Sequence, residues 1–165
     1  MDMLKNLIAY LIVLGYIPVW VFAKNDKVNY KAKQLTYNQV NGSPCKQLKG
    51  EVVCNFPVQK MTVYADEVLH YDNTDIIEAF GRVKIEGKDY VIYANALFYD
   101  PKKEAIVLEK DVMCQSEEAT LHSDKFVYHL KKQQGKFFHQ GRLVYKDIEI
   151  VSQRGIYDVD QQTFS

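Results

Sequence analysis

The sequence has no excess of charge of either sign. Its 165 residues include 21 Lys and Arg against 21 Asp and Glu, and its pI is near 6.9. Without a basic field that could gather phosphates, nucleic-acid binding is a poor hypothesis. Proline is scarce, with 4 residues, and tryptophan occurs once, whereas Tyr and Phe contribute 12 and 8 residues. This composition predicts one all-β domain with a substantial core rather than a disordered chain.

Motifs of the common catalytic and metal sites are missing as well. The sequence has no G-x-S-x-G, H-E-x-x-H or phosphate-binding glycine loop. The histidines are scattered, and no two cysteines have C-x-x-C spacing, which argues against a metal site. His122 stands beside Ser123 and Asp124, but successive residues of a strand point to opposite faces and cannot form a triad. We therefore predict no enzymatic activity and no cofactor.

Only three cysteines occur, Cys45, Cys54 and Cys114. Because the number is odd, at least one of them is free or pairs between chains. Cys45 follows a turn sequence at residues 41–44, and Cys54 lies nine residues further on, so a local Cys45–Cys54 disulfide is one hypothesis. The other hypothesis is that all three are buried as small hydrophobic side chains.

An apolar run occupies residues 7–23, after Lys5 and before the polar segment that begins at Lys24. It ends in Val21-Phe22-Ala23, which is typical of a signal-peptide cleavage site, so we predict a signal peptide at residues 1–23 and an exported domain at residues 24–165. The alternative is an uncleaved membrane anchor, because 17 apolar residues are at the lower limit for a helix that spans a bilayer.

The rest of the chain contains an internal repeat. A small residue, a polar residue, three further residues and a tyrosine recur five times, with one insertion in the second copy. The successive tyrosines, Tyr37, Tyr71, Tyr99, Tyr128 and Tyr157, are separated by 34, 28, 29 and 29 residues. A nearly constant period of this length is typical of repeat architectures in which each unit packs on its neighbours.

Each repeat predicts two strands with a bend. Ile77, Ala79, Val83 and Ile85 alternate with polar residues, as in a half-buried strand with Gly81 in its middle. In the next segment the apolar residues change parity, from Ile92 and Ala94 to Leu97 and Tyr99, and such a change of face requires a bulge or corner. Aligning the copies places the bends near Gly50, Gly81, Lys110 and Gly141, which stand two residues before Val52, Val83, Val112 and Leu143.

Turn-forming residues fall at 72–74, 87–89, 100–103, 117–118 and 131–135. We therefore predict that residues 28–160 form only antiparallel β-structure, as hairpins of long bent strands. Stacked hairpins of this kind give a β-roll of two antiparallel sheets, with an apolar interior that is open at both ends.

Several segments resemble the OstA-like domain of lipopolysaccharide-transport proteins, namely LptA, LptC and the N-terminal part of LptD. The resemblance rests on residues 64–72, on residues 78–85, and on Ala94-Asn95 with Tyr99-Asp100, which follow a degenerate A-D-x-x-x-Y and A-x-G-x-V-x-I rhythm. It implies a periplasmic β-jelly-roll whose interior holds the acyl chains of lipopolysaccharide (lipid A), and whose ends pair with other transport proteins of this kind. The implied role is a bridge between the inner and outer membranes in outer-membrane assembly. One departure is Lys110-Asp111, where other copies have glycine.

The candidate lipid-binding residues are the apolar positions that recur from copy to copy on the predicted inner face. They are Val63, Ala65, Val83, Ile85, Ile92, Ala94, Val112, Leu121, Leu143 and Ile150. Each one alone is explained by core packing, so the hypothesis rests on the set as a whole.

Two other functions stay open, a structural or adhesive β-repeat module and a membrane-anchored component of the LptC type. The terminal segments 28–37 and 148–157 have no proline and little inward-pointing charge to protect an exposed strand edge. This favours pairing with another chain, either a second copy or a different transport protein.

Overall fold

The computed structural model describes residues 28–57, 60–117, 119–129, 131–132, 134–158 and 163–164. The predicted signal peptide at residues 1–23 lies outside them. Within the described residues the chain is built of β-strands: β1 Asn29–Lys31, β2 Gln34–Val40, β3 Ser43–Phe56, β4 Met61–Tyr71, β5 Ile77–Glu86, β6 Tyr90–Asp100, β7 Ala105–Ser116, β8 Ala119–His129, β9 Gln134–Tyr145, β10 Ile148–Asp158 and β11 Thr163–Phe164. The all-β prediction is confirmed, and the strands end and begin around each predicted turn.

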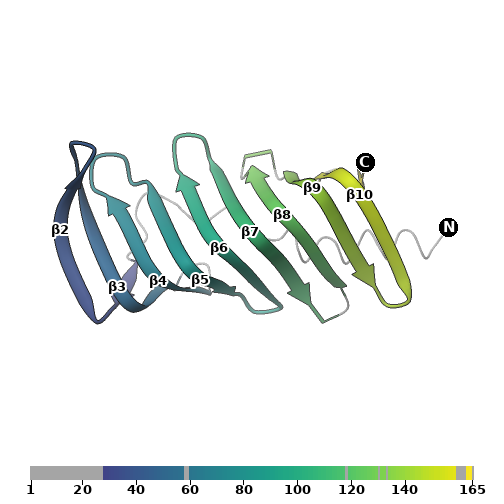
Figure 1. Ribbon diagram of the computed structural model, residues 1–165, viewed down its shortest axis with the longest axis horizontal. Coiled ribbons are helices and arrows are strands. Elements are labelled where there is room, and N and C mark those ends of the chain that lie inside the picture. Colours follow the sequence, from purple (N-terminus) through teal and green to yellow (C-terminus); the bar gives the residue numbers. More distant parts are fainter. Residues whose placement is uncertain are drawn as a thin grey trace.

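The strands form one antiparallel sheet in which, from β2 to β11, each pairs with its neighbours in the chain. The order is β1-β3-β4-β5-β6-β7-β8-β9-β10-β11, and β2 also pairs with β3. β1 and β2 occupy the two halves of the same edge, because β1 pairs with residues 53–55 of β3 and β2 with residues 43–49. The strands therefore lie side by side along the long axis of the molecule (Figure 1). No helix of the described residues is long and apolar enough to cross a membrane.

Every strand from β3 to β10 passes through a corner near its middle. On β3, β5, β7 and β9 two consecutive residues at the corner have positive φ: Gly50 and Glu51, Gly81 and Arg82, Lys110 and Asp111, His139 and Gln140. On the partner strands β4, β6, β8 and β10, only one residue is left unpaired opposite each of these corners. These residues are Asp66, Asn95, Asp124 and Gln153. Two residues opposite one make a β-bulge, which bends the strands and explains the change of parity seen in the sequence.

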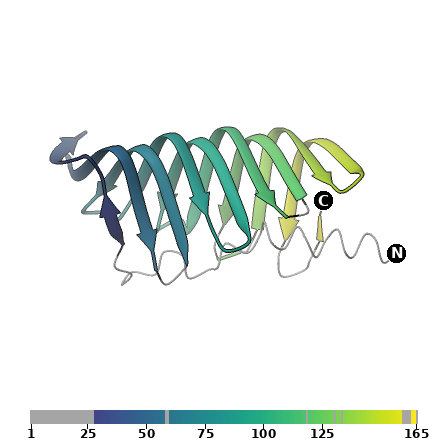
Figure 2. The same ribbon diagram turned by 90° about the horizontal axis from the view of Figure 1, so that it is seen from below.

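The corner divides the sheet into two arms. We call the half that contains Val52, Val83 and Val112 the first arm, and the half that contains Leu48, Leu97 and Leu108 the second arm. The prediction of two sheets is corrected here, since one continuous sheet is folded over at the corners and its strands curve from one arm into the other (Figure 2). The hydrogen-bonded ladder continues through the fold on both sides of each bulge.

The core consists of inward-facing rows that run along the roll, one residue from each strand. On the first arm, cross-strand pairing joins Cys54, Val63, Ile85, Ile92, Cys114, Leu121, Leu143 and Ile150 in that order. On the second arm it joins Leu48, Val68, Ala79, Leu97, Leu108, Phe126 and Phe137. These side chains belong to one hydrophobic cluster, with Ile150 packed against it and partly buried. Burial between the arms therefore holds the fold closed, while backbone hydrogen bonds hold neighbouring strands together.

Lys110 and Asp111 make the same corner as the glycine-containing copies. Their φ angles are 64° and 53°, against 75° for Gly50 and 71° for Gly81. The left-handed conformation costs a non-glycine residue about 1–2 kcal/mol. Asp111 compensates in part, because its side chain accepts a hydrogen bond from Nδ2 of Asn95 at 2.9 Å. The bend is thus regular although the glycine is absent.

Gly141 occupies a different place from the one expected. The positive-φ pair of its copy is His139 and Gln140, whereas Gly141 pairs with Ser152, just as Val52 pairs with Ala65. Gly141 is therefore the counterpart of a core valine rather than of the corner glycine. A Cβ atom at Gly141 would lie 2.2 Å from Cε2 of Phe137, so the Phe137 ring fills the space that the valine side chain takes in the other copies.

The Cys45–Cys54 disulfide is not formed, since all three cysteines are free and buried. Both residues lie on β3, with Cys45 on the second arm and Cys54 on the first. Cys45 pairs with Tyr71 and Cys54 with Val63, on opposite sides of the corner at Gly50 and Glu51, and the two sulfur atoms are not bonded.

We expect Gly141→Val to destabilise the protein by about 1–3 kcal/mol, because the new side chain overlaps the Phe137 ring. In a Phe137→Ala background the same change should cost less or stabilise the fold, since the valine then fills vacated space. Urea unfolding of the wild type, both single variants and the double variant measures this coupling. An equal cost of Gly141→Val in both backgrounds would show that the ring is not what excludes a side chain.

Candidate functional site

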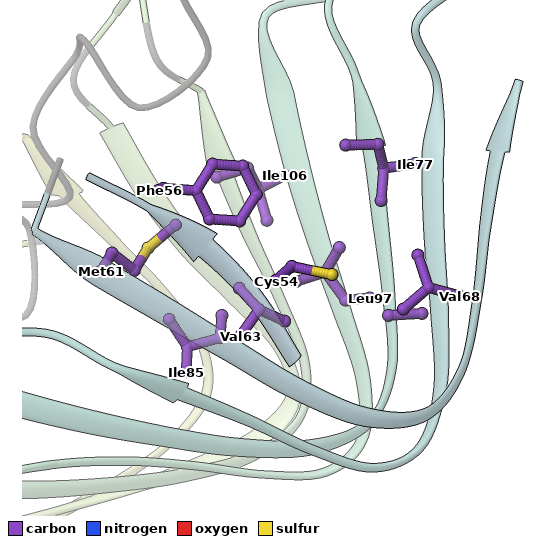
Figure 3. Close-up of a pocket in the computed structure, with 10 residues that line it drawn as sticks. Cys54, Phe56, Met61, Val63, Val68, Ile77, Ile85, Leu97 and Ile106 are labelled. Atoms are coloured by element: carbon purple, nitrogen blue, oxygen red, sulfur yellow. The ribbon is translucent and has the colours of Figure 1, made fainter. Parts of the chain in front are cut away.

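A cavity lies between the two arms near the N-terminal end of the roll. The first arm contributes Cys54, Phe56, Met61, Val63 and Ile85, and the second arm contributes Val68, Ile77, Ala79, Leu97 and Ile106. Figure 3 shows these side chains pointing toward one another from the two arms. The lining carries no charged residue and no hydroxyl or amide side chain, so the space is suited to hydrocarbon rather than to a polar ligand.

The cavity is narrow in this conformation. The space between the lining side chains, including its open part, is about 470 Å³, but only about 20 Å³ of it admits a water-sized sphere. That volume holds about one water molecule. A bulkier apolar ligand can therefore enter only if the arms separate or the lining side chains move.

The thiols of Cys54 and Cys114 are neutral. Burial raises the pKa of Cys54 and of Cys114 to about 12. Both stand in the inward row of the first arm, four strands apart, so they act as small apolar side chains there. This matches the second of the two hypotheses for the cysteines. Within the described part of the chain, no group of three or more His, Cys, Asp and Glu side chains lies close enough together to hold a metal ion.

Buried polar groups of the described residues are satisfied by the backbone. The Ser123 hydroxyl lies 3.0 Å from the carbonyl oxygens of Lys125 and Phe138, and a carboxylate oxygen of Asp100 accepts from the backbone N–H of Lys102 at 3.0 Å. Ser123 is buried on the inner face while its neighbours His122 and Asp124 are exposed, as the argument against a triad required. These polar groups stabilise corners and turns and do not point at the cavity.

The structure places all ten predicted inner-face residues on the first arm. Nine are buried and Ile150 is partly buried. Only Val63 and Ile85 line the cavity itself. The prediction missed the opposite wall, which includes Val68, Leu97 and Ile106, although the change of parity after each corner was a usable signal for it. Lipid binding by any of these residues stays a prediction.

Large apolar side chains are exposed at both ends of the roll. Leu35 and Tyr37 on β2 are 53% and 69% exposed, and Val151 on β10 is 54% exposed. Leu35 pairs with Leu48, so it extends the inward row of the second arm past β3 to the edge of the sheet. Among the described residues β2 has no further strand beyond it on this edge. The inward row of the second arm therefore ends, among the described residues, at Leu35 on an edge strand.

Comparisons with known proteins agree with this architecture. Residues 25–165 match a family model described as OstA-like protein. A similar solved structure is LptH from Pseudomonas aeruginosa, described as the LptA-homologous periplasmic component of the conserved lipopolysaccharide transport device. The two chains are 17% identical with a TM-score of 0.54, and the match covers 67% of this chain and 80% of that chain. No curated protein matched the sequence.

We expect Ile92→Asp to destabilise the fold by about 4 kcal/mol or more, because it removes a side chain that is 2% exposed and buries an unpaired carboxylate. Tyr93→Asp is the matched control, since Tyr93 is 37% exposed on the outer face and pairs with Lys84. That change should cost less than about 1 kcal/mol. Thermal and urea unfolding of both variants measures the difference, and similar losses would contradict the assignment of the inner face.

Proposed function

The chain belongs to the OstA-like protein family, and from this premise we propose that it is a component of lipopolysaccharide transport that holds lipid acyl chains between its two arms. The observation that carries the proposal is the wholly apolar cavity where the arms meet. The inward rows continue beyond this cavity, over eight successive strands on the first arm and seven on the second, which offers an acyl chain a continuous hydrocarbon surface. The known transport role of the similar LptH chain supports the same assignment.

The energy of such binding comes from removing methylene groups from water, about 0.8 kcal/mol for each group. Against it stands the cost of separating two arms that are packed on each other. The fold keeps this cost low, because the hydrogen bonds of the sheet run between neighbouring strands and not from arm to arm. Opening then needs changes of backbone angle at the corners and the loss of packing between the arms, while the ladders persist.

Location outside the cytoplasm is part of the proposal. The apolar segment at residues 7–23 with its Val21-Phe22-Ala23 ending supports export and cleavage after Ala23, which leaves residues 24–165 in the periplasm. If the segment is retained, the protein is a membrane-anchored component of the same system.

A structural module is the second candidate, and one observation favours it. The cavity admits only about one water molecule, as expected for an interior that its own side chains fill. The carrier and the structural module differ in whether inward positions ever contact lipid in the cell.

We expect a photoreactive residue at Ile85 to crosslink lipopolysaccharide in cells, while the same residue at the adjacent outward Lys84 does not. Ile85 lines the cavity, and Lys84 lies on the outer face with its ammonium near the Tyr64 ring. Immunoblots for lipopolysaccharide after irradiation read out the capture. Crosslinking from Lys84 and never from Ile85 would mean that the interior is an ordinary core.

Pairing of the terminal strands with neighbouring chains is a second part of the proposal. The β2 edge presents Leu35 and Tyr37, and the β10 segment presents Val151 and Ile156, among its exposed side chains. Neither segment contains proline. An edge of this kind is suited to adding a strand from another chain, and a roll extended in this way would continue its inward rows into the partner.

We expect the pair of changes Leu35→Lys and Tyr37→Lys to abolish self-association, because inward charge on an edge strand opposes strand addition. Phe80→Lys is the matched control, since Phe80 is exposed at 41% but lies on β5, which has a neighbour on each side. Light scattering over a range of protein concentrations measures the mass. A wild type that stays monomeric, or an equal loss in Phe80→Lys, would contradict end-to-end pairing of copies.

A further inference from the structure

Tyr30 and His70 meet across the N-terminal opening of the roll. Tyr30 lies on β1, which belongs to the first arm, and His70 lies in the second-arm half of β4. The Tyr30 hydroxyl oxygen is 3.3 Å from Nδ1 of His70, and the two ring centroids are 6.1 Å apart. The contact therefore ties one arm to the other through side chains 40 residues apart in the chain.

The pair stands next to the apolar cavity. Tyr30 is the cross-strand partner of Cys54, and His70 is the partner of Ile77. Both partners line the cavity, one on each arm. Tyr30 is itself on the edge strand of the first arm, and β3 and then β2, with the exposed Leu35 and Tyr37, lie between His70 and the edge of the second arm. Tyr30 and His70 thus bridge the two arms beside the cavity, at the N-terminal edge of the sheet.

The surroundings of His70 fix its hydrogen-bonding role. Its Nε2 atom is 3.8 Å from a carboxylate oxygen of Asp75, so the tautomer that carries hydrogen on Nε2 is favoured and Nδ1 is left as an acceptor for the Tyr30 hydroxyl. The other charged groups near the ring are Lys46 on β3 and Asp72 in the β4–β5 turn, which pair with each other at 2.6 Å.

We propose that Tyr30 and His70 form a latch that closes the N-terminal end of the interior, and that the latch must open for an acyl chain to pass between the cavity and a neighbouring chain. The passage of lipid rests on the proposed function, whereas the latch itself concerns only the opening of the arms. An arm-to-arm tie at this place holds the cavity shut when it is empty and keeps water from its apolar wall.

Acid weakens the latch. Burial, with a smaller effect of Lys46, lowers the pKa of His70 below its ordinary value, although Asp75 and Asp72 act in the opposite direction. The folded state therefore favours the neutral ring. The contribution of the neutral ring to the stability of the folded state is complete above the ordinary pKa of about 6.5. As pH falls through the lowered pKa of the folded state, the ring gains a proton on Nδ1 and can no longer accept the hydrogen bond from Tyr30.

The rate at which the Cys54 thiol is alkylated reports opening of the latch without any lipid. Burial raises the pKa of this thiol to about 12, so reaction with iodoacetamide requires exposure. Cys114 is the internal reference, because its pKa is also about 12 and it stands in the same inward row four strands away. Peptide mass spectrometry distinguishes the two sites in one sample.

We expect Tyr30→Phe to raise the alkylation rate of Cys54 about fivefold, the factor for losing one hydrogen bond of typical net strength, and to leave Cys114 unchanged. His70→Leu should act similarly, and the double variant should add little to either single change. Tyr93→Phe on the outer face is the control. The ratio of Cys54 to Cys114 rates should also rise between about pH 7.5 and about pH 5.5 in the wild type but not in Tyr30→Phe.

Two results would overturn the latch: no change at Cys54, or equal acceleration at Cys54 and Cys114, which would mean general loosening. Entry of cis-parinaric acid, a fluorescent fatty acid, tests the lipid step separately and should accelerate in Tyr30→Phe by the same factor as Cys54 alkylation. If this probe binds neither protein while Cys54 still reacts faster in the variant, the latch stands and acyl binding fails. Binding that is equally fast in both proteins would show that lipid enters elsewhere.

Discussion

The two-for-one bulge at the corners is the constraint on which the rest of this structure depends. In a plain strand, residues of one parity face one side along the whole length. The unequal corner shifts that parity, so Ala94 before it and Leu97 after it both point inward. The shift occurs on β4, β6, β8 and β10, which have one residue at the corner, whereas β3, β5, β7 and β9 have two and keep their parity, so that Ala79 and Val83 both point inward. The roll has two apolar walls from one sheet because neighbouring strands differ by one residue at every corner, which keeps the inward residues of both arms paired with each other.

The corners also separate two kinds of stability. Along the roll, antiparallel ladders join each strand to the next, and they are directional and local. Across the roll, the arms are held mainly by apolar packing, which is not directional and can be exchanged for packing on another apolar molecule. The exchange leaves the ladders intact. This division makes an openable interior compatible with a stable sheet, and it gives a side-chain contact such as Tyr30–His70 an influence that it would lack inside a ladder.

The sequence alone predicted the strands, the turns and the corners, because each depends on residues close together in the chain. The period of the tyrosines and the parity change between Ile92 and Leu97 were sufficient for that. Gly141 was wrongly predicted to form a corner, which His139 and Gln140 form instead. A glycine that is required by a neighbouring ring looks the same in a sequence as one that is required by a positive φ. Two features needed the structure: that one sheet forms both walls, and that Tyr30 reaches His70, since the folding of the arms brings these residues together.

Neighbour-only pairing has a consequence for how such a molecule changes in evolution. Each inward row advances by one residue per strand, and the period of the later copies is 28 or 29 residues. Duplicating or deleting one complete copy would therefore lengthen or shorten the molecule while the remaining rows stay in register. The number of copies sets the length of the roll and the inward side chains set its cross-section, so neither property limits the other.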